Sequence, residues 1–291
     1  MIEPNSKLNN EIFNNLIVRD KNFVNEKFSY STFNNVQFIR CSFTDCGMNK
    51  TNWNNCLIYD SSIVNTNLSG SNFISLINNR NTYKNNDFSG SLLDNARFDN
   101  STFNKDLLNS CKINECVFNK NSLDSVSFNY SDINQFYINE SNLLNCNLQR
   151  CNTKKIFFHI CNLSDCNFLQ SVLFQISICN CNLNKIDFSQ TNMNNGLICQ
   201  ENKTDFIISE CNFLEMKTNN LSLDNLVITK CLLNHINFNN MILRNVDIKE
   251  SEIKYSQLQQ IKSEELNICN SVSTNRSIPP TGKNFGDLCK T

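Results

Sequence analysis

The chain has 291 residues, a formal net charge of −1 and 40% hydrophobic residues. No apolar run approaches the ~18 residues that a membrane-spanning helix needs, and the start, MIEPNSKLNN, lacks the basic and apolar regions of a secretory signal. The hydrophobic fraction is too high for a disordered chain, and the balanced charge argues against a phosphate-binding surface. The unusual feature is the abundance of Asn and Cys, which number 57 and 16 residues.

A repeat of five residues begins after a lead-in over residues 1–10. The column of every fifth residue from Phe13 to Ile268 has 52 positions, and it holds 17 of the 22 Phe. The column two residues earlier holds 12 of the 16 Cys, and the other three columns are mostly polar. A period of five fits neither a helix nor a plain strand, whereas two residues two apart point to one side of a strand. The pattern therefore predicts a solenoid over residues 11–270.

These pentads resemble the motif of the pentapeptide-repeat family, A(D/N)LXX with a buried central Leu or Phe. The segments SNLLNCNLQRCN (141–152) and CNLSDCNFLQ (161–170) match it closely, with Cys or Ser in place of Ala. The resemblance implies an all-β fold, a right-handed quadrilateral parallel β-helix with four pentads in each coil. Equivalent residues of successive coils then stack on one another.

The cysteines have two readings, a metal or disulfide framework and a set of small interior residues. Consecutive pentads face different sides, so pairs such as Cys41 and Cys46 cannot converge on one metal ion. Free Cys behaves as a small buried hydrophobe, which is what the small column needs. We therefore expect thiols, no metal site, no cofactor and a reducing, cytoplasmic location. Three pairs are expected to stack as thiols: Cys146/Cys166, Cys161/Cys181 and Cys211/Cys231.

Asparagine fills the outward and corner columns, for example at Asn65, Asn85, Asn142 and Asn162. Its amide both donates and accepts, so equal residues on successive coils can form hydrogen-bonded ladders. Asn also tolerates turn conformations. We expect these structural roles for most of the 57 Asn, with a recognition surface as the alternative.

Four polar residues interrupt the apolar column before its end. Asn78, in INNRNTYKNN (77–86), and Lys203, in CQENKTDF (199–206), are predicted to mark bulges or short loops. The same holds for Thr153 and Thr218, where a polar residue tolerated in the core is the alternative. Burying the Lys203 charge without a partner would be costly.

One outward column is unexpectedly apolar. With four pentads in each coil, the positions before the core residue on one face read Ile17, Gln37, Leu57, Ile77, Arg97, Val117, Tyr137, Phe157, Ser177 and Leu197. The equivalent positions on another face are polar: Asn22, Ser42, Ser62, Thr82, Thr102, Ser122, Asn142 and Asn162. An exposed apolar stripe marks a partner site, although β-branched and aromatic residues also simply favour strands. The candidate docking or dimer surface comprises Leu57, Ile77, Val117, Tyr137, Phe157 and Leu197.

The C-terminal end departs from the repeat. Residues 254–270, KYSQLQQIKSEELNICN, contain helix-forming Gln, Lys and Glu, and we consider a short helical cap there, because an uncovered strand edge needs protection. Residues 271–291, with Pro279, Pro280 and Gly282, are predicted to be an irregular tail.

Catalysis has little support. The only histidines are His159 and His235, in outward columns, and no nucleophile–base arrangement or Gly-rich phosphate loop is present. We therefore expect no enzyme, no catalytic residue and no cofactor-binding residue. The expected function is a protein-interaction scaffold with an unidentified protein partner, a homodimer being one candidate, and with no membrane span and no direct nucleic-acid contact.

The resemblance adds more specific expectations. The Phe/Cys/Asn-rich repeat looks most like the β-helical part of effectors that pathogenic bacteria deliver into host cells, including HECT-like ubiquitin ligases. This implies a secreted effector or its β-helical domain, exported without a cleavable signal peptide. The alternative is a gyrase-binding DNA mimic that gives quinolone resistance, but a net charge of −1 lacks the acidic stripe that mimicry needs. A bacterial cytosolic protein of unassigned role is the third reading.

Overall fold

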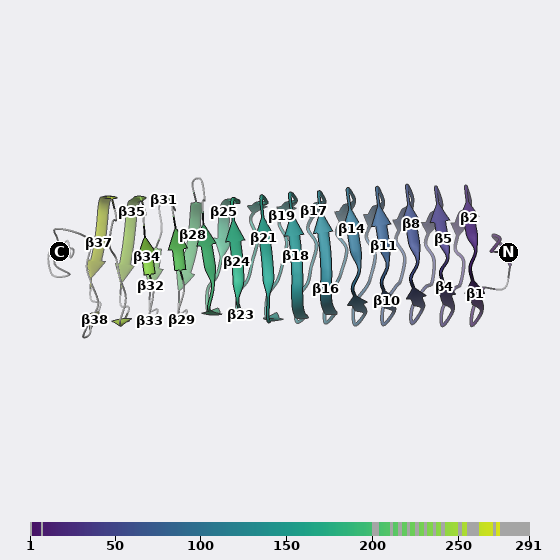
Figure 1. Ribbon diagram of the computed structural model, residues 1–291, viewed down its shortest axis with the longest axis horizontal. Helices are drawn as coiled ribbons and strands as arrows, with labels where there is room; N and C mark the ends of the chain where they lie inside the picture. Colours follow the sequence, from purple (N-terminus) through teal and green to yellow (C-terminus); the bar gives the residue numbers. More distant parts are fainter. Residues whose placement is uncertain are drawn as a thin grey trace. The chain divides into compact units, whose positions relative to one another are not determined.

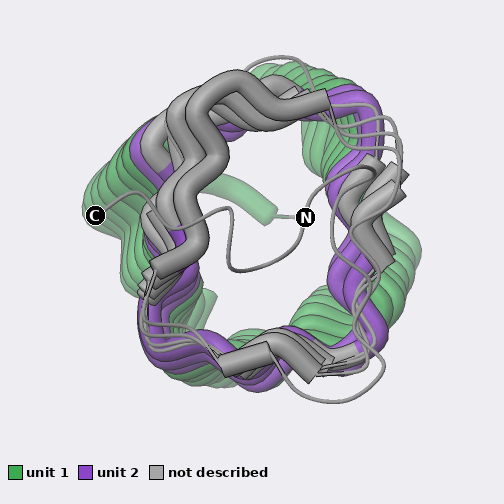
Figure 2. The backbone as a smooth tube through the Cα atoms, turned by 90° about the vertical axis from the view of Figure 1, so that its left-hand side faces the viewer, with its two compact units in different colours: residues 1–147 green, residues 148–291 purple. Residues whose placement is uncertain are grey.

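The protein is a parallel β-helix whose coils contain four pentads each. The computed structural model describes residues 2–6 and 8–199 and, farther along, strand residues between 204 and 273. All regular structure in this part is β-strand, and it falls into two compact units, residues 1–147 and 148–291. Neighbouring strands are parallel (Figure 1). Equivalent residues of successive coils align, as Phe33 does with Trp53. The predicted right-handed β-helix is confirmed, and within residues 1–147 the backbone traces four sides (Figure 2).

Unit 1, residues 1–147, has four faces, which we number in chain order. The first face contains β1 (Ile12–Asn14), β4 (Thr32–Asn34), β7 (Asn52–Asn54), β10 (Asn72–Ile74), β13 (Leu92–Asp94) and the first halves of β16 (Lys112–Asn119) and β18 (Asp132–Asn139). The second face contains β2 (Ile17–Arg19), β5 (Gln37–Ile39), β8 (Leu57–Tyr59), β11 (Ile77–Asn79), β14 (Arg97–Asp99) and the second halves of β16 and β18. The third face contains β3 (Asn22–Val24), β6 (Ser42–Thr44), β9 (Ser62–Val64), β12 (Thr82–Lys84), β15 (Thr102–Asn104), β17 (Ser122–Asp124) and β19 (Asn142–Leu144). The fourth face is a row of parallel bridges from Lys27 to Asn147.

Unit 2 repeats this order. Its first face contains β20 (Asn152–Thr153), β23 (Val172–Phe174), β26 (Asn192–Asn194), β29 (Asn212–Leu214), β33 (Leu232–Asn234), β36 (Glu252–Lys254) and β38 (Val272–Ser273). Its second face contains β21 (Ile156–His159), β24 (Ile176–Cys179), β27 (Leu197–Cys199), β30 (Lys217–Asn219) and β34 (Asn237–Asn239). The remaining strands belong to the third face, the fourth face or both: β22 (Asn162–Ser164), β25 (Asn182–Asp187), β28 (Thr204–Ser209), β31 (Ser222–Asp224), β32 (Val227–Thr229), β35 (Ile242–Lys249) and β37 (Lys262–Cys269).

The C-terminal part continues the β-helix where a helical cap was considered. Strand β37 pairs with β35 and places Ile268 opposite Ile248, its equivalent in the previous coil. A helix over residues 262–269 is therefore wrong. The physical reason is that the apolar spacing of five, which a helix cannot bury on one face, persists here. Residues 255–261 and the tail beyond 273 lie outside the described residues.

Large residues of the core column fill the interior of unit 1. Phe33, Phe38, Phe43 and Trp53 are each 0% exposed. The ring centroids of Phe33 and Trp53, one coil apart, are 4.4 Å from each other, and those of Phe38 and Phe43, on neighbouring faces, are 5.2 Å apart. The interior is therefore a packed stack of aromatic rings along the coils, held by contacts of the kind that aromatic pairs prefer.

The small column has a second role besides fitting the interior. Many of its Cys and Ser side chains donate a hydrogen bond to the backbone carbonyl of a core-column residue in the previous coil. Cys56 Sγ lies 3.2 Å from the Phe33 oxygen, and Ser71 Oγ lies 3.0 Å from the Met48 oxygen. Thiol, hydroxyl and amide groups can all donate, whereas Ala cannot. This shared contact explains why Cys and Ser replace the Ala of the family motif.

The buried cysteines are thiols, with one exception among the described residues. Ten cysteines of the small column are buried thiols, including the stacked pairs Cys146/Cys166 and Cys161/Cys181. Burial raises the pKa of Cys56 to about 11 and also raises the pKa values of Cys41, Cys46, Cys111 and Cys116, so these five groups are protonated and unreactive. Cys179, an outward residue of β24, is instead disulfide-bonded, so the expectation of thiols is wrong there. Cys211 and Cys231 lie outside the described residues.

Asparagine is abundant because the corners are left-handed. Nearly every fifth residue has a positive φ near 50–60°, and 35 non-glycine residues adopt this conformation in the described part. Asn or Asp supplies 17 of them, consistent with the low cost of the left-handed region for these two residue types. The predicted ladders also form, because Asn85 Nδ2 donates to Asn65 Oδ1 at 3.1 Å and Asn54 Nδ2 donates to Asn34 Oδ1 at 2.8 Å.

The predicted loop at Asn78 is wrong. Asn78 lies in β11, aligned with Ile58 and Phe98, and is 0% exposed. A strand persists because the interior supplies a partner: the Tyr83 hydroxyl donates to Asn78 Oδ1 at 2.6 Å. Thr153 is likewise a buried residue of β20, whose Oγ1 has no hydrogen-bond partner.

The other two interruptions lie farther along the chain. Thr218 lies in β30, in register with Ile198. Lys203 is outside the described residues. The pairing of β25 with β28, the strands before and after it in the third-face column, shifts by one residue between Leu183 and Ile186.

Candidate interaction face

The second face of unit 1 carries an apolar stripe on its outer surface. In β8, Ile58 is buried, whereas Leu57 and Tyr59 on either side of it point outward and are half-exposed. The other strands of this face in unit 1 repeat the pattern, except that Asp99 in β14 is buried. We define the apolar stripe as the outward residues Ile17, Gln37, Leu57, Ile77, Arg97, Val117 and Tyr137.

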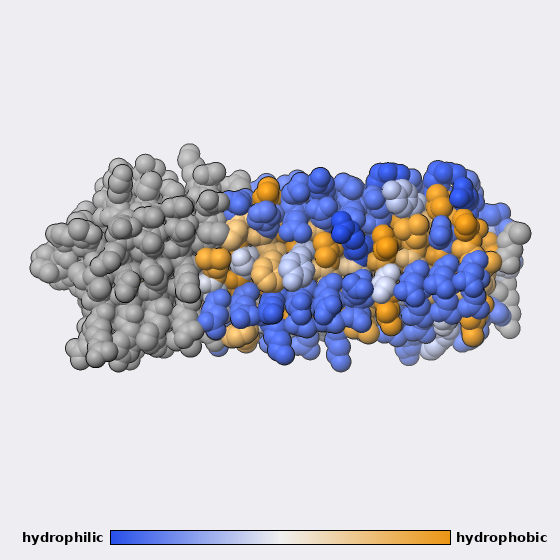
Figure 3. Space-filling model, in the orientation of Figure 1, coloured by the Kyte–Doolittle hydropathy of each residue, from blue (hydrophilic) through white to orange (hydrophobic). Residues whose placement is uncertain are grey.

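These side chains are accessible to a partner. Ile17 is 58% exposed and Ile77 is 48% exposed, and Leu57, Val117 and Tyr137 are half-exposed. The hydrophobic residues gather along this face in a band with polar residues on both sides (Figure 3). The stripe is interrupted at two places, by Gln37 and by Arg97, whose guanidinium pairs with Asp99 at 2.5 Å.

The third face provides the contrast. Its equivalent column is polar throughout unit 1, from Asn22 through Ser62 and Thr102 to Asn142. The buried columns behind the two faces are both apolar, as Phe38 and Phe43 show. Strand propensity acts on both faces alike, so it does not by itself explain the apolar residues of the second face.

A row of alternating charges borders the stripe at the corner between the second and third faces. We define the charge ladder as Asp20, Arg40, Asp60, Arg80, Asn100, Lys120 and Glu140, one residue from each coil. Arg40 pairs with Asp20 at 2.6 Å and Arg80 with Asp60 at 2.5 Å, each through two hydrogen bonds. The hydrogen bonds from Arg40 and Arg80 lower the pKa values of Asp20 and Asp60 below their usual range. The ladder is therefore charged at neutral pH.

The opposite border of the stripe is almost uncharged. We define the amide edge as the corner residues Asn15, Asn35, Asn55, Ser75, Asn95, Glu115 and Gln135. Asn35 Nδ2 donates to Asn15 Oδ1 at 3.0 Å, so part of this edge is a hydrogen-bonded ladder. The second face thus has two borders of different chemistry.

In unit 2, the candidate residues of the same column are Phe157 in β21 and Leu197 in β27. Phe157 is half-exposed and Leu197 is 37% exposed. Ser177 lies between them in the column. His159, also on this face, is exposed, and its Nε2 lies 3.4 Å from Asn180 Nδ2. Unit 2 therefore presents apolar residues in this column too, and His235 lies outside the described residues.

Sequence reasoning identified the stripe and missed the charge ladder. The ladder had a readable signal, because its charges alternate in sign from one coil to the next between Asp20 and Arg80. That signal appears only when the chain is aligned by coils of 20 residues. A column of every fifth residue mixes the corners of all four faces, so the alternation of charge is lost in it.

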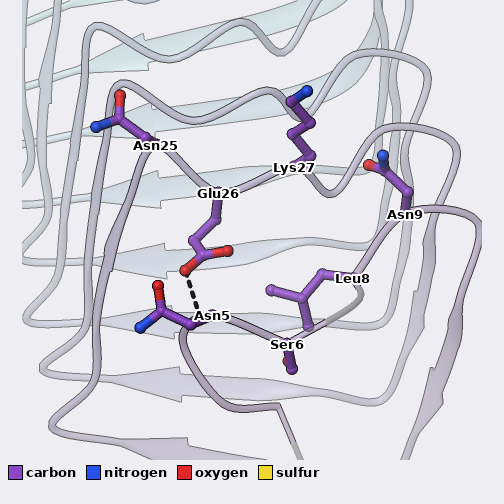
Figure 4. Close-up of a pocket in the computed structure, with 7 residues that line it drawn as sticks. All are labelled: Asn5, Ser6, Leu8, Asn9, Asn25, Glu26 and Lys27. Atoms are coloured by element: carbon purple, nitrogen blue, oxygen red, sulfur yellow. Dashed lines mark hydrogen bonds between the residues drawn. The ribbon is translucent and has the colours of Figure 1, made fainter.

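A pocket opens at the N-terminal end of unit 1 (Figure 4). It measures about 440 Å³ and is lined by residues of the first turns, with Glu26 and Lys27 as its charged groups. The Glu26 carboxylate accepts a hydrogen bond from the Asn5 backbone N–H at 2.6 Å. The lining holds no nucleophile with a neighbouring base, so it does not form a catalytic arrangement.

Metal sites and membrane crossings each require a particular arrangement of residues. Among the described residues, no group of three or more His, Cys, Asp or Glu side chains is placed to hold a metal ion. Within the same residues, no helix has the length and apolar character of a membrane crossing.

Coils of four pentads, a buried large residue at each pentad centre and a left-handed corner after it together define the class of the fold. The protein is a parallel β-helix of five-residue repeats, with four repeats in each coil. The profile of a family described as the SV2A/B/C luminal domain matches residues 2–83, less than a third of the chain, and so does not assign the chain to that family. No curated protein matches the sequence significantly.

Similar solved structures include three β-proteins. Full-length QnrB1, a plasmid-mediated fluoroquinolone resistance protein, has 12% identity and a TM-score of 0.31 over 74% of this chain and 94% of that chain. HetL, a pentapeptide-repeat protein involved in heterocyst differentiation regulation in the cyanobacterium Nostoc, has 10% identity and a TM-score of 0.26 over 88% and 90%. The catalytic unit of an α-1,3-glucanase from Streptomyces thermodiastaticus has 8% identity and a TM-score of 0.40 over 94% and 65%. At these identities and scores, none of the matches transfers a function to this chain.

Proposed function

We propose that the protein is a non-enzymatic interaction scaffold that binds a protein partner through its second face. The observation that carries this proposal is the apolar stripe, in which Ile17 and Ile77 are about half exposed to solvent. Exposed apolar residues in a contiguous band with polar borders are typical of protein–protein docking sites. The equivalent column of the third face, which is polar, is the comparison that shows this band to be specific to the second face.

The chemistry of the face favours a protein over a nucleic acid. Its centre is apolar, and the charge ladder beside it alternates in sign, so the border has no net field of one sign. Nucleic acids require a basic surface, and a mimic of DNA requires an acidic one. A protein surface with apolar anchors and mixed charge fits both features.

The test compares two triple variants of the full chain. Replacing Val117, Tyr137 and Phe157 with Ser removes the apolar anchors, and the matched control replaces Thr102, Ser122 and Asn142 of the third face with Ala. Both sets point outward, so both variants should keep the native circular dichroism spectrum. We expect the stripe variant to lose association with its protein partners in pull-downs, whereas the control keeps it. Unchanged association of the stripe variant would contradict the proposal.

The more specific roles have their own tests. A secreted effector should carry a reporter into host cells when the reporter is fused to the chain's first thirty residues. A gyrase-binding DNA mimic should protect gyrase in a supercoiling assay, and absence of protection at micromolar concentration would exclude that alternative. The resemblance of the repeat supports the effector role. We also propose that the protein folds in a reducing, cytoplasmic environment, which its buried thiols support and the disulfide at Cys179 does not.

A further inference from the structure

We propose that the partner of the apolar stripe is a second copy of this chain, packed face to face and antiparallel. The two-fold axis would pass between the coil of Asp60 and the coil of Arg80. This inference rests on the proposed docking role of the second face and names the occupant of that face. Three features of unit 1 carry it: the two borders, the alternation of the charges and the order of residues in the stripe.

The borders select the antiparallel orientation. When two copies of one face pack against each other about a two-fold axis, a parallel arrangement sets the left border of one copy against the right border of the other. An antiparallel arrangement sets each border against its own kind. Only the antiparallel arrangement therefore brings charge ladder against charge ladder and amide edge against amide edge.

The alternating charges select where the axis lies along the coils. An axis that passes between two coils pairs every acidic position of the ladder with a basic or neutral position of the second copy. An axis that passes through a coil pairs like with like, for example Arg40 with Arg40. The ladder side chains are available for such contacts, because Arg40 and Asp20 are 54% and 60% exposed and Lys120 and Glu140 are 53% and 48% exposed. Like charges held opposite each other disfavour association, so the second class of arrangement is excluded.

The stripe selects one arrangement from the permitted class. An axis between the coils of Asp60 and Arg80 superposes six coils and sets the ladder pairs Asp20–Lys120, Arg40–Asn100 and Asp60–Arg80. The same axis sets the stripe pairs Ile17–Val117, Leu57–Ile77 and Gln37–Arg97. Apolar residues then meet apolar residues, and the two polar interruptions meet each other. The neighbouring permitted axis, one coil farther along, would instead set Ile77 against Arg97.

The second outward column of the face is compatible with this arrangement. Tyr59 lies opposite Asn79, and Arg19 lies opposite Asn119 of the second copy. Ile39 lies opposite Asp99, which is 8% exposed and held against Arg97, so its charge is largely covered within its own chain. The column therefore introduces no direct opposition of like charges.

The experiment uses sedimentation velocity of the full chain and of two charge variants. The acidic variant carries Arg40→Glu, Arg80→Glu and Lys120→Glu, and the basic variant carries Asp20→Lys, Asp60→Lys and Glu140→Lys. We expect the native chain to dimerise, each variant alone to bind itself at least about tenfold more weakly, and an equimolar mixture of the two to regain dimers. A parallel dimer, which sets the ladder against the amide edge, would not respond to these changes, so unaltered dimers of each variant would overturn the proposal.

A third variant guards against loss of folding. Inverting all six charges of the ladder keeps every pair within the chain, including Arg–Asp contacts like those of Arg40 and Asp20. This variant should dimerise with itself as the native chain does and should not form mixed dimers with it, which native mass spectrometry of a mixture can measure. Free mixing of the two chains would overturn the proposed position of the axis.

The outcomes also separate this inference from the proposed function. A native chain that stays monomeric at the highest concentration tested, while the triple Ser variant of Val117, Tyr137 and Phe157 loses a different protein partner, would overturn only the identity of the occupant. A second variant with Ser in place of Ile17, Leu57 and Ile77 changes residues that lie within the six superposed coils. If neither variant alters self-association or partner binding, both proposals are overturned.

Discussion

The coils over residues 32–71 and those over residues 72–111 have different interiors inside the same backbone. In the first pair, the core column runs from Phe33 to Leu68 without a polar residue. In the second pair, besides Ser91 and Ser101, the interior contains five larger polar side chains, each at most 2% exposed: Asn78, Asn81, Tyr83, Asn86 and Asp106. The strand register is nevertheless the same, because Asn78 aligns with Ile58 and with Phe98 at the usual offset.

The difference shows what the coil requires of its interior residues. In the polar coils, Asn81 Nδ2 donates to the Ile58 carbonyl at 2.8 Å and Asn86 Nδ2 donates to the Ile63 carbonyl at 2.8 Å. These are the same carbonyl contacts that Cys and Ser make in the apolar coils. The interior therefore accommodates polar residues whose donors mostly meet acceptors, although Asn78 Nδ2 has no partner, whereas packing of large rings supplies the stability elsewhere.

The largest effect should come from removing a ring in the apolar coils. Trp53 is fully buried against Phe33 and Phe38, and its Nε1 donates to Thr51 Oγ1 at 2.8 Å. Trp53→Ala should lower the free energy of unfolding by about 3–5 kcal/mol, because it leaves a cavity among the buried rings of Phe33 and Phe38. Urea unfolding measures this loss. Ser62→Ala, on the outer surface, is the control and should change stability by less than about 0.5 kcal/mol.

The next effect is a pH dependence that belongs to the polar coils. Desolvation by burial raises the pKa of Asp106 from its usual 3.8 to about 7, although Asn86 donates two hydrogen bonds to it. Between these values the folded state keeps a proton that the unfolded state has lost. Stability is therefore highest below pH 4 for this group and falls as pH rises to about 7, by at most about 1.4 kcal/mol per pH unit.

Unfolding free energies measured from pH 4 to pH 8 test this dependence. Asp106→Asn removes the titrating group and should flatten the decline, while Trp53→Ala should shift the whole curve without changing its slope. An Asp106→Asn variant with the native slope would show that the decline has another source.

A smaller effect is the coupling between Asn78 and Tyr83. Asn78→Leu alone leaves the Tyr83 hydroxyl buried without its 2.6 Å acceptor, and Tyr83→Phe alone leaves Asn78 Oδ1 with only a weaker donor, Asn81 Nδ2 at 3.4 Å. Each single change should destabilise by about 1–3 kcal/mol, and the double change should recover most of that loss, because it removes both polar groups together. A double-mutant cycle in urea measures the coupling. Additive losses would show that the two side chains act independently.

Most of the fold was predictable from the sequence because the period of five is carried by nearly every coil. The apolar column alone determines the strand centres, and the Asn and Asp residues mark the corners that need a positive φ. Asn78 misled the prediction for a physical reason: its partner Tyr83 lies one pentad away, on the next face, and nothing local in the sequence shows that the two side chains meet. The predicted helical cap is wrong over residues 262–269 because Lys and Glu are common both on exposed strand surfaces and on helix surfaces.

The candidate face was predictable in part. The stripe follows from sequence spacing once coils of four pentads are assumed, so Leu57 and Val117 could be named in advance. The ion pairs of the ladder needed coordinates, because the sequence does not show whether Arg40 reaches Asp20 or points away from it. The disulfide at Cys179 also lies outside the small column, so a rule built on that column could not find it.

The smallest expected effect separates backbone strain from packing at a corner of the polar coils. Gly90 has a φ of +70°, and a Cβ added there would meet no atom within 4 Å. Gly90→Ala should therefore destabilise by about 1 kcal/mol through the left-handed conformation alone. Gly90→Asn should cost less, since Asn adopts this conformation at many other corners, such as Asn55 and Asn95. Thermal and urea unfolding of the two variants rank them, and an Ala variant as stable as the native protein would mean that corner strain does not explain the abundance of Asn.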